Sequence, residues 1–330
     1  MNLLDKYNRI IDYMRISITD RCNLGCLYCK VGAELQTHSE KSSNTSNVIL
    51  SYDEIYKIVL AGAGLGVRKV RITGGEPLVR KDVYKLIEMI KGIETIKDIS
   101  ITTNGLLLEE NVEKLACAGL DRVNISIDSL KSPIYKEITR GGDIDAVFRG
   151  LYRAAQFGLT PIKINMVPIK GLNDCEIEDF VRLAMDTSYQ IRFIELMPYG
   201  RNAQWNNEHF ISAAEIAARV EKVAALTPIR FKVPGVARYY RLNKGNGIVG
   251  FISPVSNHFC MTCNRLRLTS KGMIRPCLFS DAEIDIGTVV RRGAGMDEIQ
   301  EILLKAVNEK SVGHRGNLET GTNSMSEIGG

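Results

Sequence analysis

Three cysteines near the N-terminus form the first group of residues with evident chemistry. Cys22, Cys26 and Cys29 have the spacing C-x3-C-x2-C, directly after the alternating run at 14–19. A structural zinc site normally uses four protein ligands, whereas three thiolates on a cubane iron–sulfur cluster leave one iron open to a small molecule. The spacing therefore favours an iron–sulfur cluster, and a zinc site completed by a distant ligand is the alternative.

A second group of three cysteines lies near the other end of the chain. It consists of Cys260, Cys263 and Cys277, in the spacing C-x2-C-x13-C. His258 could complete a tetrahedral zinc site with these thiolates. However, Arg265 and Arg267 alternate on one face of the strand expected next, and guanidinium groups bind phosphate well. The pattern thus indicates a second metal site beside a phosphate-binding surface.

The composition is that of an ordinary globular protein and limits the class of function. The 330 residues are 45% hydrophobic and 25% charged. The N-terminus lacks a basic start and the apolar runs are short, so we expect a cytoplasmic protein without a membrane anchor. Six of the eight cysteines fall in the two groups, which indicates metal and not disulfides. Cys117 and Cys175 each lie apart from the other cysteines, and we interpret them as packing residues without a chemical role. The net charge of +5 suits a phosphorylated ligand but is too small to indicate nucleic acid.

Short alternating runs with helical patterns between them predict a repeated β/α order. The expected strands are 13–19, 68–73, 98–103, 121–127, 161–167 and 190–195. The expected helices are 52–63, 81–91, 108–118, 143–157, 175–187 and 212–222. Two of these helices begin on capping boxes, at Ser51 to Glu54 and at Ser212 to Glu215.

The expected strands have one apolar and one polar face. The polar positions are Arg15, Ser17, Thr19, Lys69, Arg71, Thr73, Ser100, Thr102, Asn104, Arg122, Asn124, Ser126, Asp128, Lys163 and Asn165. A closed barrel fills its lumen with branched apolar side chains, whereas charges require a wet or ligand-filled cavity. We therefore predict an α/β fold with an open, partial (β/α)6 TIM-type barrel around an anionic substrate.

Beyond residue 225 the pattern changes to hairpin-like segments at 237–253 and 265–275, followed by a helix at 296–309. We expect a barrel domain of residues 1–225 and a smaller C-terminal α+β domain of residues 226–312 that binds a cluster. The polar stretch at 37–47 and the tail at 313–330, which ends in Gly329-Gly330, are expected to be flexible.

The first cysteine group, together with Gly74-Gly75-Glu76-Pro77 after the second strand, resembles the radical S-adenosylmethionine (SAM) enzymes. The resemblance implies that three cysteines hold a 4Fe-4S cluster whose open iron binds SAM. The reduced cluster would then cleave SAM to a 5′-deoxyadenosyl radical. By position, the implied SAM contacts are Tyr28, Gly74, Gly75, Glu76, Asn104, Ser126 and Met197.

Further motifs are similar to one family, the GTP 3′,8-cyclases of molybdenum cofactor biosynthesis. They are the stretches 15–29, 71–78 and 102–105, the second cysteine group with Asn264-Arg265-Leu266-Arg267, and the terminal Gly-Gly. The resemblance implies a lyase with a second 4Fe-4S cluster, whose open iron binds the guanine of GTP. The radical would remove the ribose 3′ hydrogen, and C3′ would attack C8 to give (8S)-3′,8-cyclo-7,8-dihydroguanosine 5′-triphosphate. The implied GTP contacts are Arg15, Lys69, Arg71, Thr102, Lys163, Arg192, Arg265, Leu266 and Arg267.

The same resemblance implies partners. They are a downstream cyclic pyranopterin monophosphate synthase, an electron donor of the flavodoxin or ferredoxin type, and a homodimer, with neither membrane nor nucleic acid. Two positions depart from the family. Lys30-Val31 stands where Met-Pro is usual, and the tail lacks the arginines often found before its end. Two other functions stay open: a radical SAM enzyme that modifies peptides, and a zinc module that binds nucleic acid.

Overall fold

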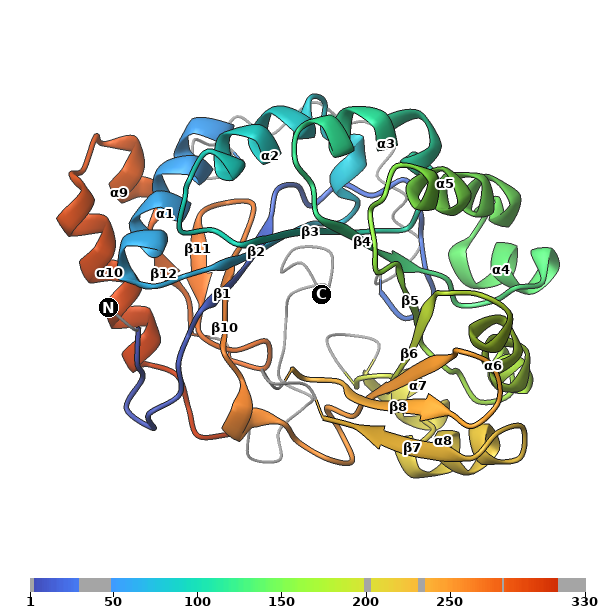
Figure 1. Cartoon of the computed structure of the whole chain (residues 1–330). Helices are drawn as coiled ribbons and strands as arrows, with labels where there is room; N and C mark the ends of the chain where they lie inside the picture. Colours follow the sequence, from blue (N-terminus) through green and yellow to red (C-terminus); the bar gives the residue numbers. More distant parts are fainter. Residues whose placement is uncertain (1–2, 30–48, 199–202, 231–234, 281, 314–330) are drawn as a thin grey trace.

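A continuous, curved β-sheet with helices on its outer side organises the molecule (Figure 1). The computed structural model describes residues 3–29, 49–198, 203–230, 235–280 and 282–313. The loop at 37–47 and nearly all of the tail from 313 onward, which were expected to be flexible, lie outside the described residues. In the part of the chain that is described, no helix has the length and apolar character needed to cross a bilayer.

Within the described residues the sheet contains twelve strands, and its central part is parallel. In spatial order the strands are β12 (Ile284–Asp285), β11 (Met273–Arg275), β10 (Arg265–Leu268), β1 (Tyr13–Ser17), β2 (Lys69–Thr73), β3 (Asp98–Thr103), β4 (Arg122–Ser126), β5 (Lys163–Met166), β6 (Gln190–Ile194), β9 (Ile248–Ile252), β8 (Arg238–Leu242) and β7 (Leu226–Ile229). The strands from β10 to β9 run parallel, and antiparallel hairpins extend both edges. The predicted open, partial barrel is confirmed.

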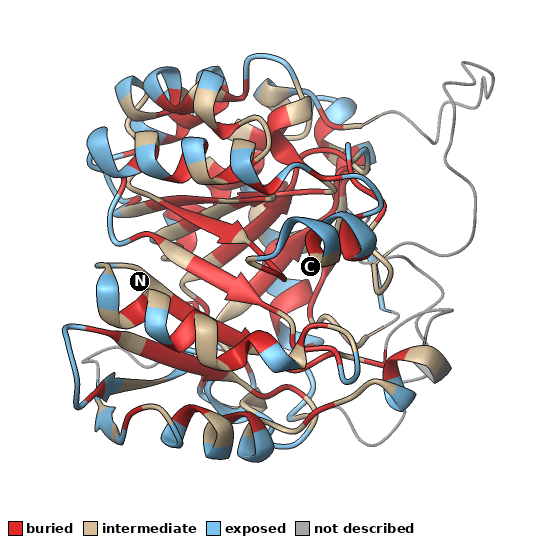
Figure 2. Cartoon of the chain, turned by 90° about the vertical axis from the view of Figure 1, so that its right-hand side faces the viewer, coloured by how far each residue is buried: buried red, intermediate tan, exposed pale blue. Residues whose placement is uncertain are grey.

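Most of the helices cover the convex side of this sheet (Figure 1). The helices of the described residues are α1 (Tyr52–Leu65), α2 (Val83–Lys91), α3 (Leu108–Cys117), α4 (Ser132–Thr139), α5 (Ile144–Gln156), α6 (Ile177–Asp186), α7 (Ala203–Glu208), α8 (Ala213–Glu221), α9 (Gly287–Arg291) and α10 (Met296–Asn308). Short 3-10 turns lie at Pro77–Val79, Asp174–Glu176 and Cys260–Thr262. The inner faces of the helices are buried and their outer faces exposed, as Figure 2 shows.

Local sequence signals account for the helix ends. Ser51 Oγ accepts a hydrogen bond from the Glu54 backbone N–H at 3.1 Å, and Glu54 Oε2 accepts one from the Ser51 N–H at 2.7 Å. This is the predicted capping box of α1, and Gly66 ends the helix in the left-handed region with φ of 112°. For α8, Ser212 Oγ accepts from the Glu215 N–H. The helix α4 was not predicted, because its eight residues are too short for a clear helical period.

The C-terminal strands attach to both edges of the N-terminal strands. β10 pairs with β1 and β9 pairs with β6, in each case in parallel. Helix α10 packs beside α1, where Gln300 Nε2 donates to the Ala61 carbonyl (Figure 1). Residues 226–312 therefore continue the sheet of the first 225 residues, and the division into two domains stays a prediction.

Candidate functional site

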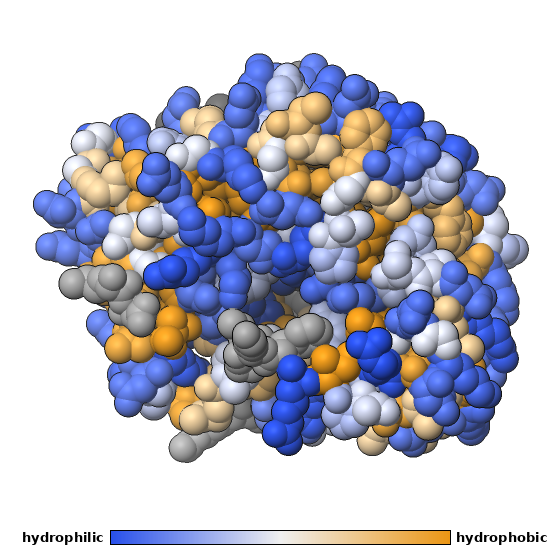
Figure 3. All heavy atoms as spheres, viewed as in Figure 1, coloured by the Kyte–Doolittle hydropathy of each residue, from blue (hydrophilic) through white to orange (hydrophobic). Residues whose placement is uncertain are grey.

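The concave side of the sheet encloses a cavity of about 580 Å³. Both cysteine groups line it, although more than 200 residues of chain separate them. In the space-filling view, hydrophilic residues gather around the hollow at the centre of this face (Figure 3). The cysteines on its wall are Cys22, Cys26, Cys29, Cys260, Cys263 and Cys277. None of these six cysteines forms a disulfide, and all have intermediate exposure, which suits ligands at the edge of a substrate site.

The first cysteine loop is held by backbone hydrogen bonds to the unpredicted helix α4. Gly25 and Leu27 donate to the carbonyls of Thr139 and Ile138, at 3.1 and 3.0 Å. The Cys29 N–H closes a turn on the Cys26 carbonyl at 3.0 Å. The loop is thus fixed at the C-terminal end of the barrel strands, where ligands bind in such folds.

Two glycines after β2 let this loop approach closely. The Gly75 and Glu76 N–H groups donate to the carbonyls of Thr19 and Arg21, both at 2.8 Å. A Cβ on Gly75 would lie 2.3 Å from the Arg21 carbonyl oxygen, and a Cβ on Gly74 would lie 2.6 Å from that of Thr19. Side chains at either position would push the cysteine loop away, so the physical need for glycine here is a close backbone approach.

The buried carboxylate of Glu76 organises the neighbouring strand end. It accepts hydrogen bonds from Thr103 Oγ1 and from the Asn104 N–H, both at 2.7 Å, and from the Leu78 N–H. Asn104 in turn donates to Asn23 in the cysteine loop. Burial raises the pKa of Glu76 to about 7, although these hydrogen bonds oppose the shift. The motif therefore links β2, β3 and the cysteine loop into one unit.

Tyr28, between two of the cysteines, is fixed by Asp128 at the end of β4. Its hydroxyl donates to Asp128 Oδ2 at 2.7 Å, and the other carboxylate oxygen accepts from the Val167 N–H at 2.9 Å. Burial raises the pKa of Asp128 to about 6. Burial, Asp128 and the other two cysteines of the group raise the pKa of Cys26 well above its usual value. Three thiolates so placed repel one another, and a cationic iron cluster would relieve that repulsion.

The second cysteine group has the opposite electrostatic surroundings. Although burial acts to raise it, the pKa of Cys263 is lowered to about 6, because Arg265 and Lys310 lie close to the thiol. Cys260 and Cys263 flank a single 3-10 turn. Among the described residues, no three His, Cys, Asp or Glu side chains converge closely enough to hold a single metal ion. The thiolate-favouring surroundings fit a three-cysteine cluster.

A row of cations crosses the inner face of the sheet between the two cysteine groups. In the register of the parallel strands, Arg15 on β1 pairs with Arg267 on β10 and with Arg71 on β2. Like charges on neighbouring strands are destabilising. Burial, and then the charges of Arg267 and Arg71, lower the pKa of Arg15 well below its usual value. A bound polyanion would relieve this repulsion, so the row fits a polyphosphate.

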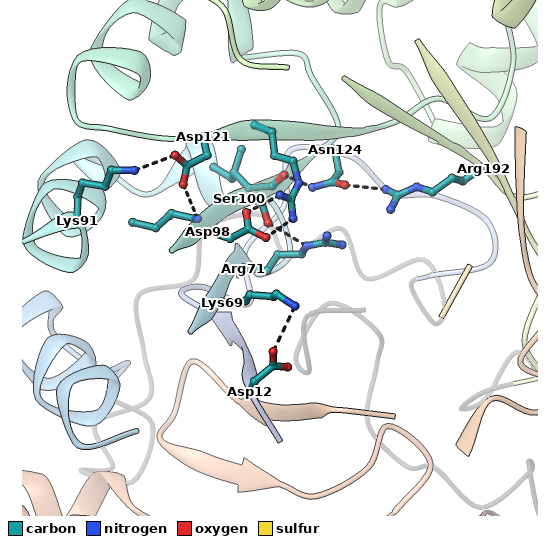
Figure 4. A network of polar contacts seen from close by, with 12 residues as sticks. Asp12, Lys69, Arg71, Lys91, Asp98, Ser100, Asp121, Asn124 and Arg192 are labelled. Atoms are coloured by element: carbon teal, nitrogen blue, oxygen red, sulfur yellow. Dashed lines mark hydrogen bonds and ion pairs between the residues drawn. The ribbon is translucent and has the colours of Figure 1, made fainter. Parts of the chain in front are cut away.

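The other side chains of the row have partners that fix their direction (Figure 4). Arg122 forms a two-pronged ion pair with Asp98, and Lys69 lies 3.2 Å from Asp12. Arg71 donates to Ser100 Oγ at 3.2 Å, and Arg192 donates to Asn124 Oδ1 at 2.7 Å. Burial, followed by Arg192, Arg122 and Arg71, lowers the pKa of Lys163 to about 7.

Several buried polar atoms on the cavity wall make no hydrogen bond within the described part of the chain. They include Tyr13 Oη, Thr102 Oγ1 and Arg267 Nη1. Buried polar groups are nearly always paired, so such a set suits a polar ligand in the cavity. Tyr13 lies under the Arg71 guanidinium, with 5.5 Å between the guanidinium carbon and the ring centre.

The cavity brings together nearly all the residues predicted from the sequence. Every predicted SAM contact lines it, as does every predicted GTP contact except Leu266. Leu266 alternates with its two arginine neighbours on β10, so its side chain is fully buried in the core on the opposite face. Sequence reasoning missed Tyr13, Arg9 and Lys310. For Tyr13 the signal was available, because it shares a strand face with Arg15.

Comparisons with known proteins identify the family of the chain. Residues 16–184 match the model of the radical SAM superfamily, and residues 189–316 match the model described as Molybdenum Cofactor Synthesis C. The GTP 3′,8-cyclase of Thermodesulfovibrio yellowstonii is 49% identical over 330 residues, with 99% of each chain covered. That of Alkaliphilus oremlandii is 49% identical over 329 residues, again with 99% of each chain covered.

Among solved structures, SuiB of Streptococcus suis superimposes with a TM-score of 0.57 at 15% identity, over 93% of this chain and 68% of SuiB. SuiB with its precursor peptide SuiA gives a TM-score of 0.58 at 17% identity, over 96% and 68%. At such low identity these likenesses show the fold alone. The relatives of full length decide the assignment, and the chain belongs to the GTP 3′,8-cyclase family within the radical SAM superfamily.

Proposed function

We propose that this chain converts GTP to (8S)-3′,8-cyclo-7,8-dihydroguanosine 5′-triphosphate, an early step of molybdenum cofactor biosynthesis. One observation carries the proposal. The first cysteine group follows the end of β1, Cys260 and Cys263 precede the parallel strand β10, and both groups line one cavity with a row of buried and half-buried cations on the strands between them. A triphosphate spans such a row, and its base and ribose would then lie between the two cysteine groups.

Two 4Fe-4S clusters and SAM are the proposed cofactors. Cys22, Cys26 and Cys29 would hold the cluster that binds SAM, with Tyr28, Gly74, Gly75, Glu76, Asn104, Ser126 and Met197 around it. Cys260, Cys263 and Cys277 would hold the second cluster. When bound, the first cluster with SAM supplies a radical able to remove a hydrogen atom from an unactivated C–H bond. The protein keeps both reactants in one cavity with fixed orientation, which limits side reactions.

The cations would bind and orient the substrate. Arg15, Lys69, Arg71, Thr102, Lys163, Arg192, Arg265 and Arg267 are the proposed GTP contacts. After loss of the ribose 3′ hydrogen, C3′ would attack C8 of the same GTP molecule. The orientation of the ribose relative to the base must therefore be fixed during the reaction. Arginine forks on the phosphates give this fixed geometry.

The other proposed partners follow from the chemistry. The product requires a further enzyme, which we propose is a cyclic pyranopterin monophosphate synthase. The clusters require a one-electron donor of the flavodoxin or ferredoxin type. Metal-binding cysteines outside disulfides suit a reducing compartment, so we propose a cytoplasmic location. We also propose a homodimer as the assembly.

Anaerobic incubation of the reconstituted enzyme with SAM, reductant and one nucleoside triphosphate at a time tests the function. We expect 5′-deoxyadenosine together with a cyclised nucleotide from GTP alone. Metal analysis of the same sample should give about eight irons per chain, as two cubane clusters require. Zinc without iron would contradict the proposal and support the zinc module. Turnover of a peptide in place of GTP would support the peptide-modifying alternative.

A further inference from the structure

Two buried cations from opposite ends of the chain meet beside the second cysteine group. Arg9 precedes β1 and is 8% exposed, and Lys310 follows α10 and is 2% exposed. Both line the cavity. The chain between them includes the whole barrel, so only the tertiary structure brings them together.

Lys310 connects two of the three segments that carry cysteines. Its ammonium group donates to the carbonyl oxygen of Arg265 at 2.8 Å and to that of Pro276 at 2.7 Å. Arg265 lies two residues after Cys263, and Pro276 directly precedes Cys277. One side chain therefore fixes the spacing of these two thiols through the backbone.

Arg9 connects the third cysteine to the same structure. Its Nη1 donates to the Cys260 carbonyl at 2.7 Å, and its Nη2 donates to the Ser311 carbonyl at 2.8 Å. Its Nε is paired with the buried carboxylate of Asp5, whose other oxygen accepts from the Arg9 and Tyr7 N–H groups. All of its guanidinium nitrogens are thus used, and Ser311 directly follows Lys310.

Arg9 and Lys310 differ in whether a carboxylate lies close to their positive charge. Arg9 has Asp5 as its counter-charge, whereas within the described residues no carboxylate lies within 4.0 Å of the Lys310 ammonium. A buried, unpaired ammonium is costly, and a nearby anion lowers that cost. Three cysteine thiolates around an iron–sulfur core would supply this anion.

We propose that Arg9 and Lys310 form a clamp that positions Cys260, Cys263 and Cys277 for the second cluster, and that Lys310 also stabilises the reduced form of that cluster. They are positioning residues, because they act through the backbone and the charge of the cysteine segments. The inference rests on the proposed function, which assigns a cluster to these cysteines.

The charge of Lys310 is tested by redox titration in the Cys26→Ser background, where the second cluster is expected to be the only one assembled. Lys310→Met should shift the one-electron equilibrium about tenfold toward the oxidised form, which corresponds to a midpoint potential about 59 mV more negative. Lys305→Met is the matched control. It removes the same charge from an exposed position on α10, five residues away, and should leave the potential unchanged.

The clamp itself is tested by the rate at which a chelator removes the second cluster in the same background. Arg9→Gln breaks the connection between Cys260 and Ser311 and should speed iron loss about tenfold. Lys6→Met, which removes a cation from an exposed position three residues away, should not change the rate.

If Lys310→Met assembles no second cluster, Lys310→Arg provides the test of the clamp. Arginine keeps the positive charge and can donate hydrogen bonds to the same two carbonyl oxygens. Recovery of the cluster supports the clamp, and failure to recover overturns it.

The outcomes separate this inference from the proposed function. About four irons per chain in the wild-type protein would mean that the second cysteines hold no cluster, and the proposed function would fail with the clamp. About eight irons, together with the same potential and chelation rate in the Lys310 and Arg9 variants as in their controls, would overturn the clamp alone.

Discussion

The two cysteine groups have the same three-thiol donor set but opposite electrostatic surroundings. The first group lies beside the buried carboxylates of Glu76 and Asp128, and the pKa of Cys26 is raised well above its usual value, first by burial and then by Asp128. The second lies among Arg265 and Lys310, which lower the pKa of Cys263 to about 6 against the effect of burial. The anionic side suits SAM, whose sulfonium is positive, and the cationic side suits a triphosphate. The difference shows how one cavity can direct two ligands to different ends.

The supports of the two groups also differ. The first loop is held by backbone hydrogen bonds to α4 and to the glycines after β2, while the second depends on the side chains of Arg9 and Lys310. We therefore expect that each cysteine group can be disrupted without the other.

The largest effect is expected from Cys26→Ser, which removes a ligand of the first cluster. SAM cleavage should fall to background while the second cluster still assembles, because the two groups share no ligand. Formation of 5′-deoxyadenosine measures this, and Cys117→Ser, at an exposed position, is the control. Continued 5′-deoxyadenosine production would disprove the role of the first group.

Cys263→Ser should have the converse effect. GTP turnover should be lost while some uncoupled SAM cleavage remains, since the first cluster keeps all its ligands. Product and 5′-deoxyadenosine are measured in the same reaction, with Cys175→Ser as the control at an exposed cysteine. Unchanged GTP turnover would reduce the second group to a structural role.

Gly75→Ala should disrupt the first group without touching any cysteine. The new Cβ would lie 2.3 Å from the Arg21 carbonyl oxygen, and backbone cannot move as a side chain can. Iron content should fall toward about four per chain. Gly295→Ala, where a Cβ meets nothing within 4 Å, is the control. Full iron content in Gly75→Ala would contradict this prediction, because it would show that the first cysteine loop can move and still hold its cluster.

Arg267→Ala should weaken GTP binding about tenfold to a hundredfold, because a charge-assisted hydrogen bond contributes about 1.5–3 kcal/mol. Guanosine, which has no phosphates, should lose little affinity, and SAM binding should hardly change. Equilibrium binding of GTP and guanosine measures this, and the exposed Arg68→Ala is the control. Equal losses of affinity for GTP and guanosine would mean that Arg267 supports the fold and does not bind phosphate. Arg265→Ala should behave in the same way.

The smallest effect concerns pH. The pKa of Lys163 is lowered from 10.5 to about 7, so the ligand-free side chain loses its proton as pH rises through 7. GTP favours the charged form, so its affinity should fall by up to about tenfold between pH 7 and 8. For the ligand-free protein, the pH dependence of the free energy of unfolding has the opposite sign to that of the GTP affinity. The unfolded state binds the extra proton between pH 7 and 10.5, so this group's contribution to stability rises with pH. Lys163→Met should flatten the affinity profile, and Lys170→Met, at an exposed position, should not.

Much of the fold follows from local patterns. The predicted strands and helices match the observed ones within a few residues, because period-2 and period-3.6 patterns and capping residues act over short stretches. Alternation also placed the polar face of the strands on the cavity. The prediction for Leu266 was wrong because it was made from the position of the residue in a motif, whereas alternation places this side chain on the core face.

Sequence by itself determined the chemistry, because cysteine spacing fixes how many thiolates a short loop can offer, and alternation fixes which strand residues share a face. Only the tertiary structure decided how these parts meet. The pairing of β10 with β1 places Arg267 beside Arg15, and the path of the C-terminal segment brings Lys310 to Arg9. These contacts join residues hundreds of positions apart, and no local period carries information about such neighbours. Long-range strand pairing and burial set them, and so set the opposite electrostatics of the two cysteine groups.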